Sequence, residues 1–225
     1  MNRIPLTLLL LFAVATLIKG DPDVPPVPRI KTVTEPMVWT INYQYQEPNP
    51  YLSPPTPADA YIYDRMEKEN PRFTSSNVIK SGNKKIEITL FDDKSQTIAC
   101  MVDGIIMEKS RLTNQIQVHK ITDWGDSHSG HDFESLDWID KAEYKGRQEF
   151  QGADCYIYYL PPKEELAART AYINAKTGLP VSVQIDKLTI TYTFTPTTQA
   201  VELPPDFVVR LKKYQADQKL NASRG

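Results

Sequence analysis

Short runs of alternating apolar and polar residues, separated by turn sequences, constrain this chain more than any other feature. In residues 39–45, Trp39, Ile41 and Tyr43 share one face, while Thr40 and Asn42 share the other. A period of two residues is typical of a half-buried β-strand. The pattern returns along most of the chain, so the sequence predicts a mainly β protein.

The links between these runs are short, which indicates neighbouring antiparallel strands. Residues 73–80 and 84–91 flank a loop centred on Gly82, and Asp103-Gly104 is a strong hairpin signal. The remaining predicted strands cover residues 96–102, 105–107, 115–121, 145–150, 153–160, 169–174, 179–187 and 188–194. We expect a single curved antiparallel sheet, a half-barrel of about 10–11 strands, because a sheet this wide tends to curl.

A few short helices and a C-terminal helix are expected, and residues 58–68 form either a short helix or a continuation of the loop before them. Phe133, Leu136 and Ile139 are spaced for one short helix within residues 133–144. Pro204-Pro205 opens a C-terminal helix, in which Phe207 and Leu211 belong to an apolar stripe.

The first 20 residues resemble a signal peptide. A basic start precedes an apolar run of about 14 residues, which is shorter than the about 20 residues needed to span a bilayer. We therefore expect a periplasmic or secreted protein that is not membrane-spanning after cleavage. The expected divisions are a signal peptide at 1–20, a proline-rich tether at 21–34, the β half-barrel domain at 35–216 and a disordered tail at 217–225.

The charge and the cysteines limit the partners and the cross-links. The formal net charge of −2 argues against a nucleic-acid partner, which favours a basic face. Cys100 and Cys155 form either a disulfide, as an even pair does in an oxidising compartment, or two separate buried thiols.

One polar segment, residues 123–132, holds the residues best suited to a metal. His128, His131 and Asp132 carry imidazole and carboxylate groups, which are good ligands for zinc or manganese. A metal-dependent hydrolase is one interpretation of this segment, and a flexible polar loop with surface histidines is the other. Because the chain has no nucleophile motif and no phosphate-binding glycine loop, we expect a non-enzymatic protein without a cofactor.

Residues 171–181 (AYINAKTGLPV) and the sequence Leu203-Pro204-Pro205-Asp206-Phe207 resemble a known family. They are similar to the T-G-L-P hairpin and the closing L-P-P-x-F of exported lipoprotein carriers of the LolA, LolB and RseB type. Tyr172 and Asn174 stand where that family more often has Trp and Asp. The resemblance implies a half-barrel whose concave side handles lipid acyl chains.

The leading hypothesis is therefore an apolar ligand, a lipid or the acyl chain of a lipoprotein, held on the concave face. The candidate lining consists of apolar and aromatic residues of predicted strands: Trp39, Ile41, Tyr43, Ile86, Ile88, Leu90, Ile190 and Tyr192. The alternative is a protein-interaction or sensor module at the cell envelope, with the proline-rich loop 48–57 or an exposed sheet edge meeting the partner.

Overall fold

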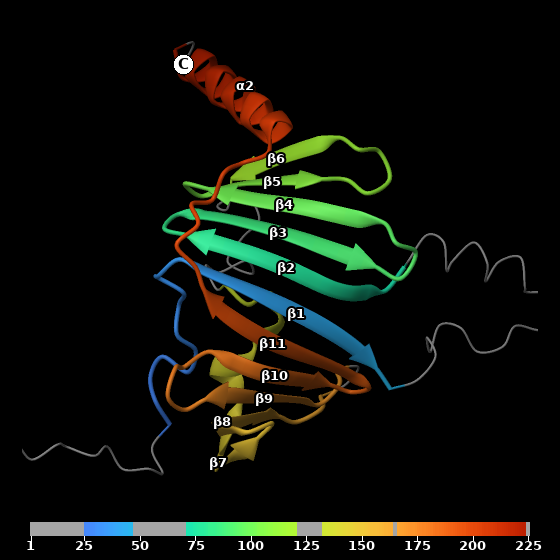
Figure 1. Ribbon diagram of the computed structural model, residues 1–225, viewed down its shortest axis with the longest axis vertical. Helices are drawn as coiled ribbons and strands as arrows, with labels where there is room; N and C mark the ends of the chain where they lie inside the picture. Colours follow the sequence, from blue (N-terminus) through green and yellow to red (C-terminus); the bar gives the residue numbers. More distant parts are fainter. Residues whose placement is uncertain (1–24, 47–70, 121–131, 164–165, 224–225) are drawn as a thin grey trace, which may run out of the picture.

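The computed structural model describes residues 25–46, 71–120, 132–163 and 166–223 (Figure 1). This part of the chain forms one eleven-stranded antiparallel sheet, which confirms the predicted fold class. The strands are β1 (Met37–Tyr45), β2 (Phe73–Ser81), β3 (Lys84–Phe91), β4 (Gln96–Val102), β5 (Ile105–Lys109), β6 (Ile116–Lys120), β7 (Glu143–Phe150), β8 (Ala153–Leu160), β9 (Arg169–Asn174), β10 (Pro180–Ile185) and β11 (Leu188–Pro196).

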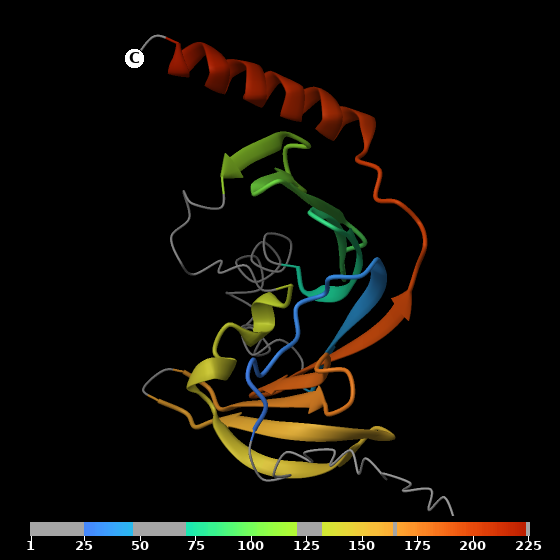
Figure 2. The same ribbon diagram turned by 90° about the vertical axis from the view of Figure 1, so that its left-hand side faces the viewer.

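The strand order is β6-β5-β4-β3-β2-β1-β11-β10-β9-β8-β7, so the first and last strands meet in the middle of the sheet. There Trp39 pairs with Phe194, Ile41 with Tyr192, and Tyr43 with Ile190. Two meanders extend outward from this central pair, β2 to β6 on one side and β10 to β7 on the other. Seen edge-on, the sheet bends around a concave face (Figure 2).

Each face of the sheet has its own hydrophobic core. On the concave face, side chains of the central strands pack against two 3₁₀ turns, η4 (Glu134–Leu136) and η5 (Ile139–Lys141). On the convex face, β3–β6 pack against Val201, Leu203 and Phe207. The last three belong to the segment after β11 and to helix α2 (Pro205–Ala222), which follow the convex side in Figure 2.

The prediction of a single short helix at residues 133–144 is wrong, because the chain forms the two 3₁₀ turns there and then enters β7. Phe133, Leu136 and Ile139 are all buried in the concave core. Their spacing of three residues matches the roughly three residues per turn of a 3₁₀ helix, which places them on one side.

The segment expected to be a tether packs onto the domain from Arg29 onward. Ile30 and Val33 are buried in the concave core, and the Lys31 amide donates to the Gly178 carbonyl at 2.8 Å. Arg29 Nη1 donates to the carbonyls of Ile139 and Ala142, both at 2.5 Å. Proline-rich composition does not reveal such docking, because the contacts come from the residues between the prolines.

Helix α2 continues through Ala222 and so includes most of residues 217–225, which were expected to form a disordered tail. No helix among the described residues is both long enough and apolar enough to cross a membrane. The predicted signal peptide and the proline-rich loop 48–57 lie outside the described residues.

Candidate functional site

The concave face is the candidate site, and its central part is filled by the protein itself. Trp39 is fully buried, with its ring centroid 5.8 Å from that of Phe133. Phe133 also meets Tyr192 edge-to-face at 5.8 Å, and the Tyr192 hydroxyl shares a hydrogen bond with Ser135. Burial raises the pKa of Tyr192, so the phenol is neutral and acts as part of this packing.

The structure divides the predicted ligand-lining residues between the two faces. Trp39, Ile41, Tyr43, Ile190 and Tyr192 share the concave face. Ile41 pairs with Tyr192 and Tyr43 with Ile190 across β1 and β11, and Trp39 lies on the same side of β1 as Ile41 and Tyr43. The other three lie on the convex side, because the pairing of Ile79 with Ile86 puts the even-numbered residues of β3 opposite the concave face. These three residues are Ile86, Ile88 and Leu90.

The concave face over β2–β6 is polar at many positions. The registers place Ser76 opposite Thr89, Thr89 opposite Thr97, and Glu108 opposite Gln117, all on this side. A buried ion pair joins Lys80 Nζ to Asp132 Oδ1 at 2.6 Å. Asp132 Oδ2 accepts the Val33 amide at 2.8 Å, so this carboxylate ties the N-terminal segment to β2.

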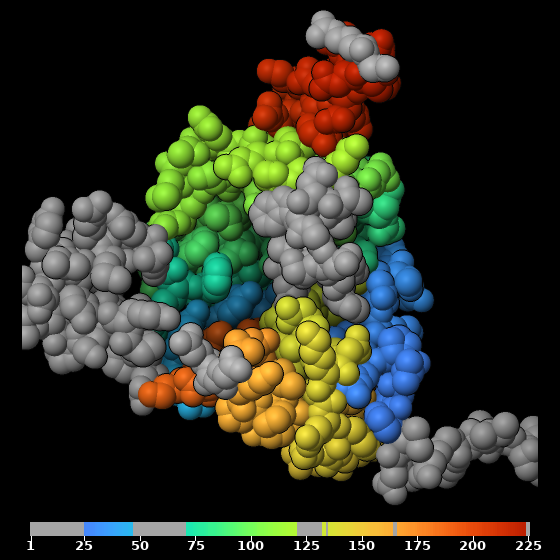
Figure 3. All heavy atoms as spheres, turned by 180° about the vertical axis from the view of Figure 1, so that it is seen from behind, coloured from blue at the N-terminus to red at the C-terminus, as the bar shows by residue number. Residues whose placement is uncertain are grey.

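A pocket of about 400 Å³ opens on the polar half of this face. Its lining comes from β2–β6 and the adjoining turns: Phe73, Phe91, Thr97, Ile98, Ala99, Glu108, Lys109, Ser110 and Gln117. Viewed from behind, the concave face is hollowed over the blue-to-green strands β1–β4 (Figure 3).

An aromatic row forms one side of the pocket. The Tyr43 and Phe73 centroids lie 5.4 Å apart, and those of Phe73 and Phe91 lie 5.2 Å apart. Arg111 lies over Phe91 at 5.4 Å and pairs with Asp93 at 3.0 Å. Such contacts hold the rings in place while leaving Phe73 45% exposed.

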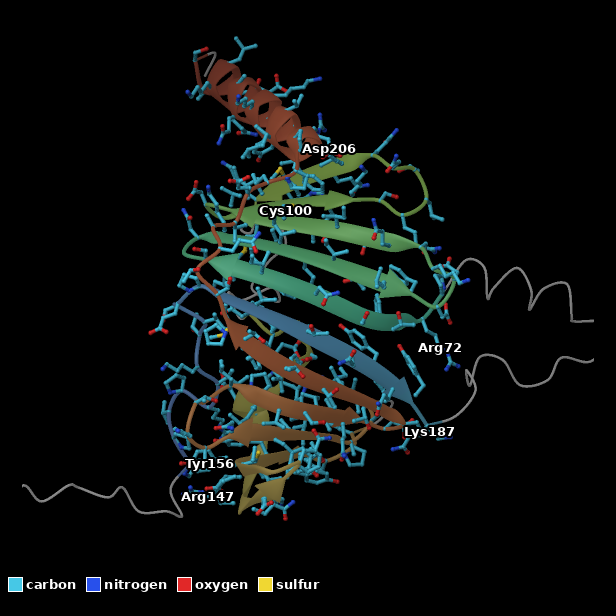
Figure 4. All side chains as sticks on the ribbon, viewed as in Figure 1. Arg72, Cys100, Arg147, Tyr156, Lys187 and Asp206 are labelled. Carbon is cyan, nitrogen blue, oxygen red and sulfur yellow. The ribbon has the colours of Figure 1, made fainter. Side chains whose placement is uncertain are left out.

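A second cation–π contact lies at the same end of the sheet. The Arg72 guanidinium is 4.7 Å from the Tyr45 ring centroid, and Arg72 projects from the start of β2 in Figure 4. Burial raises the pKa of Tyr45, while the Arg72 charge opposes that rise. Tyr45 therefore stays a neutral hydrogen-bonding aromatic at neutral pH.

The pocket aromatics were not part of the residues proposed from the sequence. Phe73 and Phe91 are nearly equidistant from the turn at Gly82, and they pair across the β2–β3 hairpin. Folding the predicted hairpin about that turn would have brought the two rings together, so a signal was present. The contribution of β4–β6 had no comparable signal.

The two cysteines are separate buried thiols, which is the second of the two alternatives. Cys100 lies on β4 and Cys155 on β8, with six strands between them in the sheet order. At about 4.8 Å for each of the seven steps between neighbouring strands, they are roughly 34 Å apart along the sheet, far beyond the about 7 Å that a disulfide allows. Burial raises the pKa of the Cys100 thiol to about 12 and also raises that of Cys155.

Asp132 is the described member of the predicted metal group, whereas His128 and His131 lie outside the described residues. Both Asp132 oxygens are engaged, one by Lys80 and one by the Val33 amide. Within the described ranges, no group of three or more His, Cys, Asp or Glu side chains could hold a metal ion.

No family model matches the chain, and no curated protein matches its sequence. Among solved structures, the chain is similar to the lipoprotein LppX of Mycobacterium tuberculosis, with 11% identity and a TM-score of 0.42 over 76% of this chain and 91% of LppX. It is also similar to the MucA/MucB complex structure of Pseudomonas aeruginosa, with 13% identity and a TM-score of 0.41 over 76% of this chain and 62% of the matched chain. LprF of Mycobacterium bovis matches with 11% identity and a TM-score of 0.36, over 76% of this chain and 89% of LprF.

The half-barrel implied by the lipoprotein-carrier resemblance is confirmed as a fold by the sheet itself. The described chain forms one curved antiparallel sheet whose edges are β6 and β7.

Proposed function

We propose that this chain is an exported, non-enzymatic binding protein that holds an amphipathic ligand on its concave face. The ligand class is a lipid or the acyl chain of a lipoprotein. The pocket beside Phe73 and Phe91 is the observation that carries the proposal.

The size and lining of the pocket support a small ligand or one end of a larger one. Its volume of about 400 Å³ lies within the about 300–1,000 Å³ of ligand pockets in general. The aromatic rings offer an apolar surface, while Thr97, Glu108 and Gln117 offer hydrogen-bonding groups on the same face. An apolar chain lying on the rings would place its polar end against Thr97 and Gln117, which can donate hydrogen bonds to it.

The proposed location of the ligand differs from the one expected from the sequence. Trp39 and Tyr192 pack against the protein's own Phe133, so the proposed ligand contacts Phe73 and Phe91 instead. Tyr43 connects the two regions, since its ring contacts that of Phe73 and it also packs against the concave core.

Lipid extraction and mass spectrometry of the purified protein, followed by titration with a fluorescent fatty acid, test this proposal. Ala99→Phe should fill the pocket and weaken fatty-acid binding by about tenfold, a loss of about 1.4 kcal/mol. The control is Leu112→Asp, which changes a 76% exposed side chain outside the pocket and should leave binding unchanged. Equal affinity for all three proteins, with no lipid extracted, would refute the proposal.

A second candidate function is protein interaction through an edge of the sheet. The edge strand β6 and the adjacent helix α2 favour it, because a groove lies between them.

A further inference from the structure

The two edge strands of the sheet differ in how well they are protected against pairing with another strand. β7 has a register shift between Tyr144 and Gly146, where Gly146 has φ of 107°, and most of its exposed side chains are charged. A bulge and charged residues both discourage strand addition. β6 pairs with β5 in an unbroken register, so it lacks the first of these protections.

The outward backbone groups of β6 can be assigned from its hairpin. The Ser110 amide donates to the Gln115 carbonyl at 2.9 Å, which makes this a hydrogen-bonded pair. Antiparallel pairs alternate, so Gln117 and its partner Glu108 are bonded, while the N–H and C=O of Ile116 and Val118 point away from β5. A side-chain contact supports this assignment, since Arg210 Nε donates to the outward Ile116 carbonyl at 3.2 Å.

Helix α2 stands beside this edge and forms a groove with it. The groove has a volume of about 480 Å³ and is lined by Asn114, Gln115, Ile116, Asp206, Val209, Arg210 and Lys213. Figure 4 shows Asp206 at the end of α2 nearest the sheet.

The charge of the groove is basic. Lys109 forms an ion pair with Asp206 at 2.9 Å and so neutralises the acidic residue of the groove. The charges that remain on the helix side are the positive ones of Arg210 and Lys213. Val209 adds an apolar contact surface, as its side chain is 69% exposed.

We propose that β6 and α2 form a docking site for an extended acidic segment of a partner protein. The segment adds as a strand beside Val118, with its backbone hydrogen-bonded to the outward N–H and C=O of that residue. Its carboxylates lie on the side of α2 and face Arg210 and Lys213, while the apolar residues that alternate with them point to the opposite face of the sheet. A second copy of this chain fits less well, because pairing two β6 edges would bring the same basic side chains of both helices together.

A short peptide of alternating Glu and Val tests the proposal, with a Lys-and-Val peptide as the comparison. Binding of the fluorescently labelled peptides to the full chain is followed by anisotropy at low and high salt. The Glu peptide should bind at low salt and weaken as salt is added, while the Lys peptide should not bind.

Two charge reversals on the same helix distinguish the groove from general charge attraction. Lys213→Glu changes a groove residue and should weaken binding of the Glu peptide by about tenfold. Lys212→Glu makes the same change at an exposed neighbour outside the groove and should alter affinity by less than about twofold. Equal losses in both variants would overturn the proposed site.

Strand addition has its own readouts. Amide hydrogen exchange at Val118 should slow when the Glu peptide binds the unmodified chain, because the outward N–H gains an acceptor. Val118→Pro removes that donor and should abolish peptide binding while the sheet persists by circular dichroism. Unchanged exchange at Val118 in the complex, or sedimentation as a dimer without peptide, would overturn the proposal.

Discussion

The buried ion pair between Lys80 and Asp132 should be one of the most sensitive points of the fold. Its two side chains are only 10% and 2% exposed, and the nitrogen and oxygen are 2.6 Å apart. The same carboxylate accepts the Val33 amide at 2.8 Å. Removing either charge therefore leaves the other charge buried without its partner.

The size of the effect follows from this geometry. Lys80→Met leaves the buried Asp132 carboxylate with its hydrogen bond from the Val33 amide but without its cation, and breaking a buried pair in this way costs about 3–5 kcal/mol. Asp132→Asn leaves the Lys80 ammonium buried, while the amide oxygen can still accept from Val33. The double variant removes both charges, so it should recover about 2–3 kcal/mol relative to the sum of the single effects.

Urea unfolding followed by tryptophan fluorescence measures these free energies, since Trp39 and Trp138 are both buried. With a slope of about 2 kcal/mol per molar urea, a loss of 4 kcal/mol lowers the midpoint by about 2 M. The ion pair makes no important contribution if each single substitution costs less than about 1 kcal/mol and the two effects simply add.

Three further predictions concern other parts of the fold. Phe207→Ala, at a fully buried site, should lower the free energy of unfolding by about 3–5 kcal/mol in the same urea assay. Gly178→Ala should lower the free energy of unfolding more than Gly104→Ala does. Both glycines have positive φ, which costs an alanine about 1 kcal/mol, but only at Gly178 would the added β-carbon meet another residue, Lys31 Cβ at 3.0 Å. Because the Cys100 pKa of about 12 keeps its buried thiol protonated at pH 8, iodoacetamide should label it slowly in the folded chain and fast in urea, as mass spectrometry can measure.

The strands were predictable because their signal is local. Alternation within a strand and the Asp103-Gly104 turn depend on a few neighbouring residues, and the structure has β4 and β5 joined at that turn. The positive φ values of Asp103 and Gly104, 50° and 74°, are those that a two-residue hairpin turn requires.

The face that each strand presents was less predictable. Ile86 and Ile88 alternate as clearly as Trp39 and Ile41, but alternation does not say which set faces inward. That choice depends on the register between β2 and β3 and on the C-terminal segment, which gives the convex side of β3 an apolar cover. Such information comes from residues distant in sequence, such as Phe207.

The pocket combines both kinds of information. The Phe73–Phe91 contact belongs to one hairpin and follows from its turn, whereas Glu108 and Gln117 reach the pocket only when β4–β6 join the curved sheet. The depth of the hollow depends on sheet curvature, which residue alternation does not specify.

The junction of β1 with β11 has a consequence for how the chain reaches its native state. These strands come from opposite ends of the domain, yet they occupy adjacent central positions. During synthesis, β1 can pair with β2 early, but it cannot pair with β11 until nearly all of the polypeptide has been made. Contacts between such distant residues slow folding. We therefore expect the pairing of β1 with β11 to limit the folding rate, while β2–β6 and β7–β10 form from local hairpins beforehand.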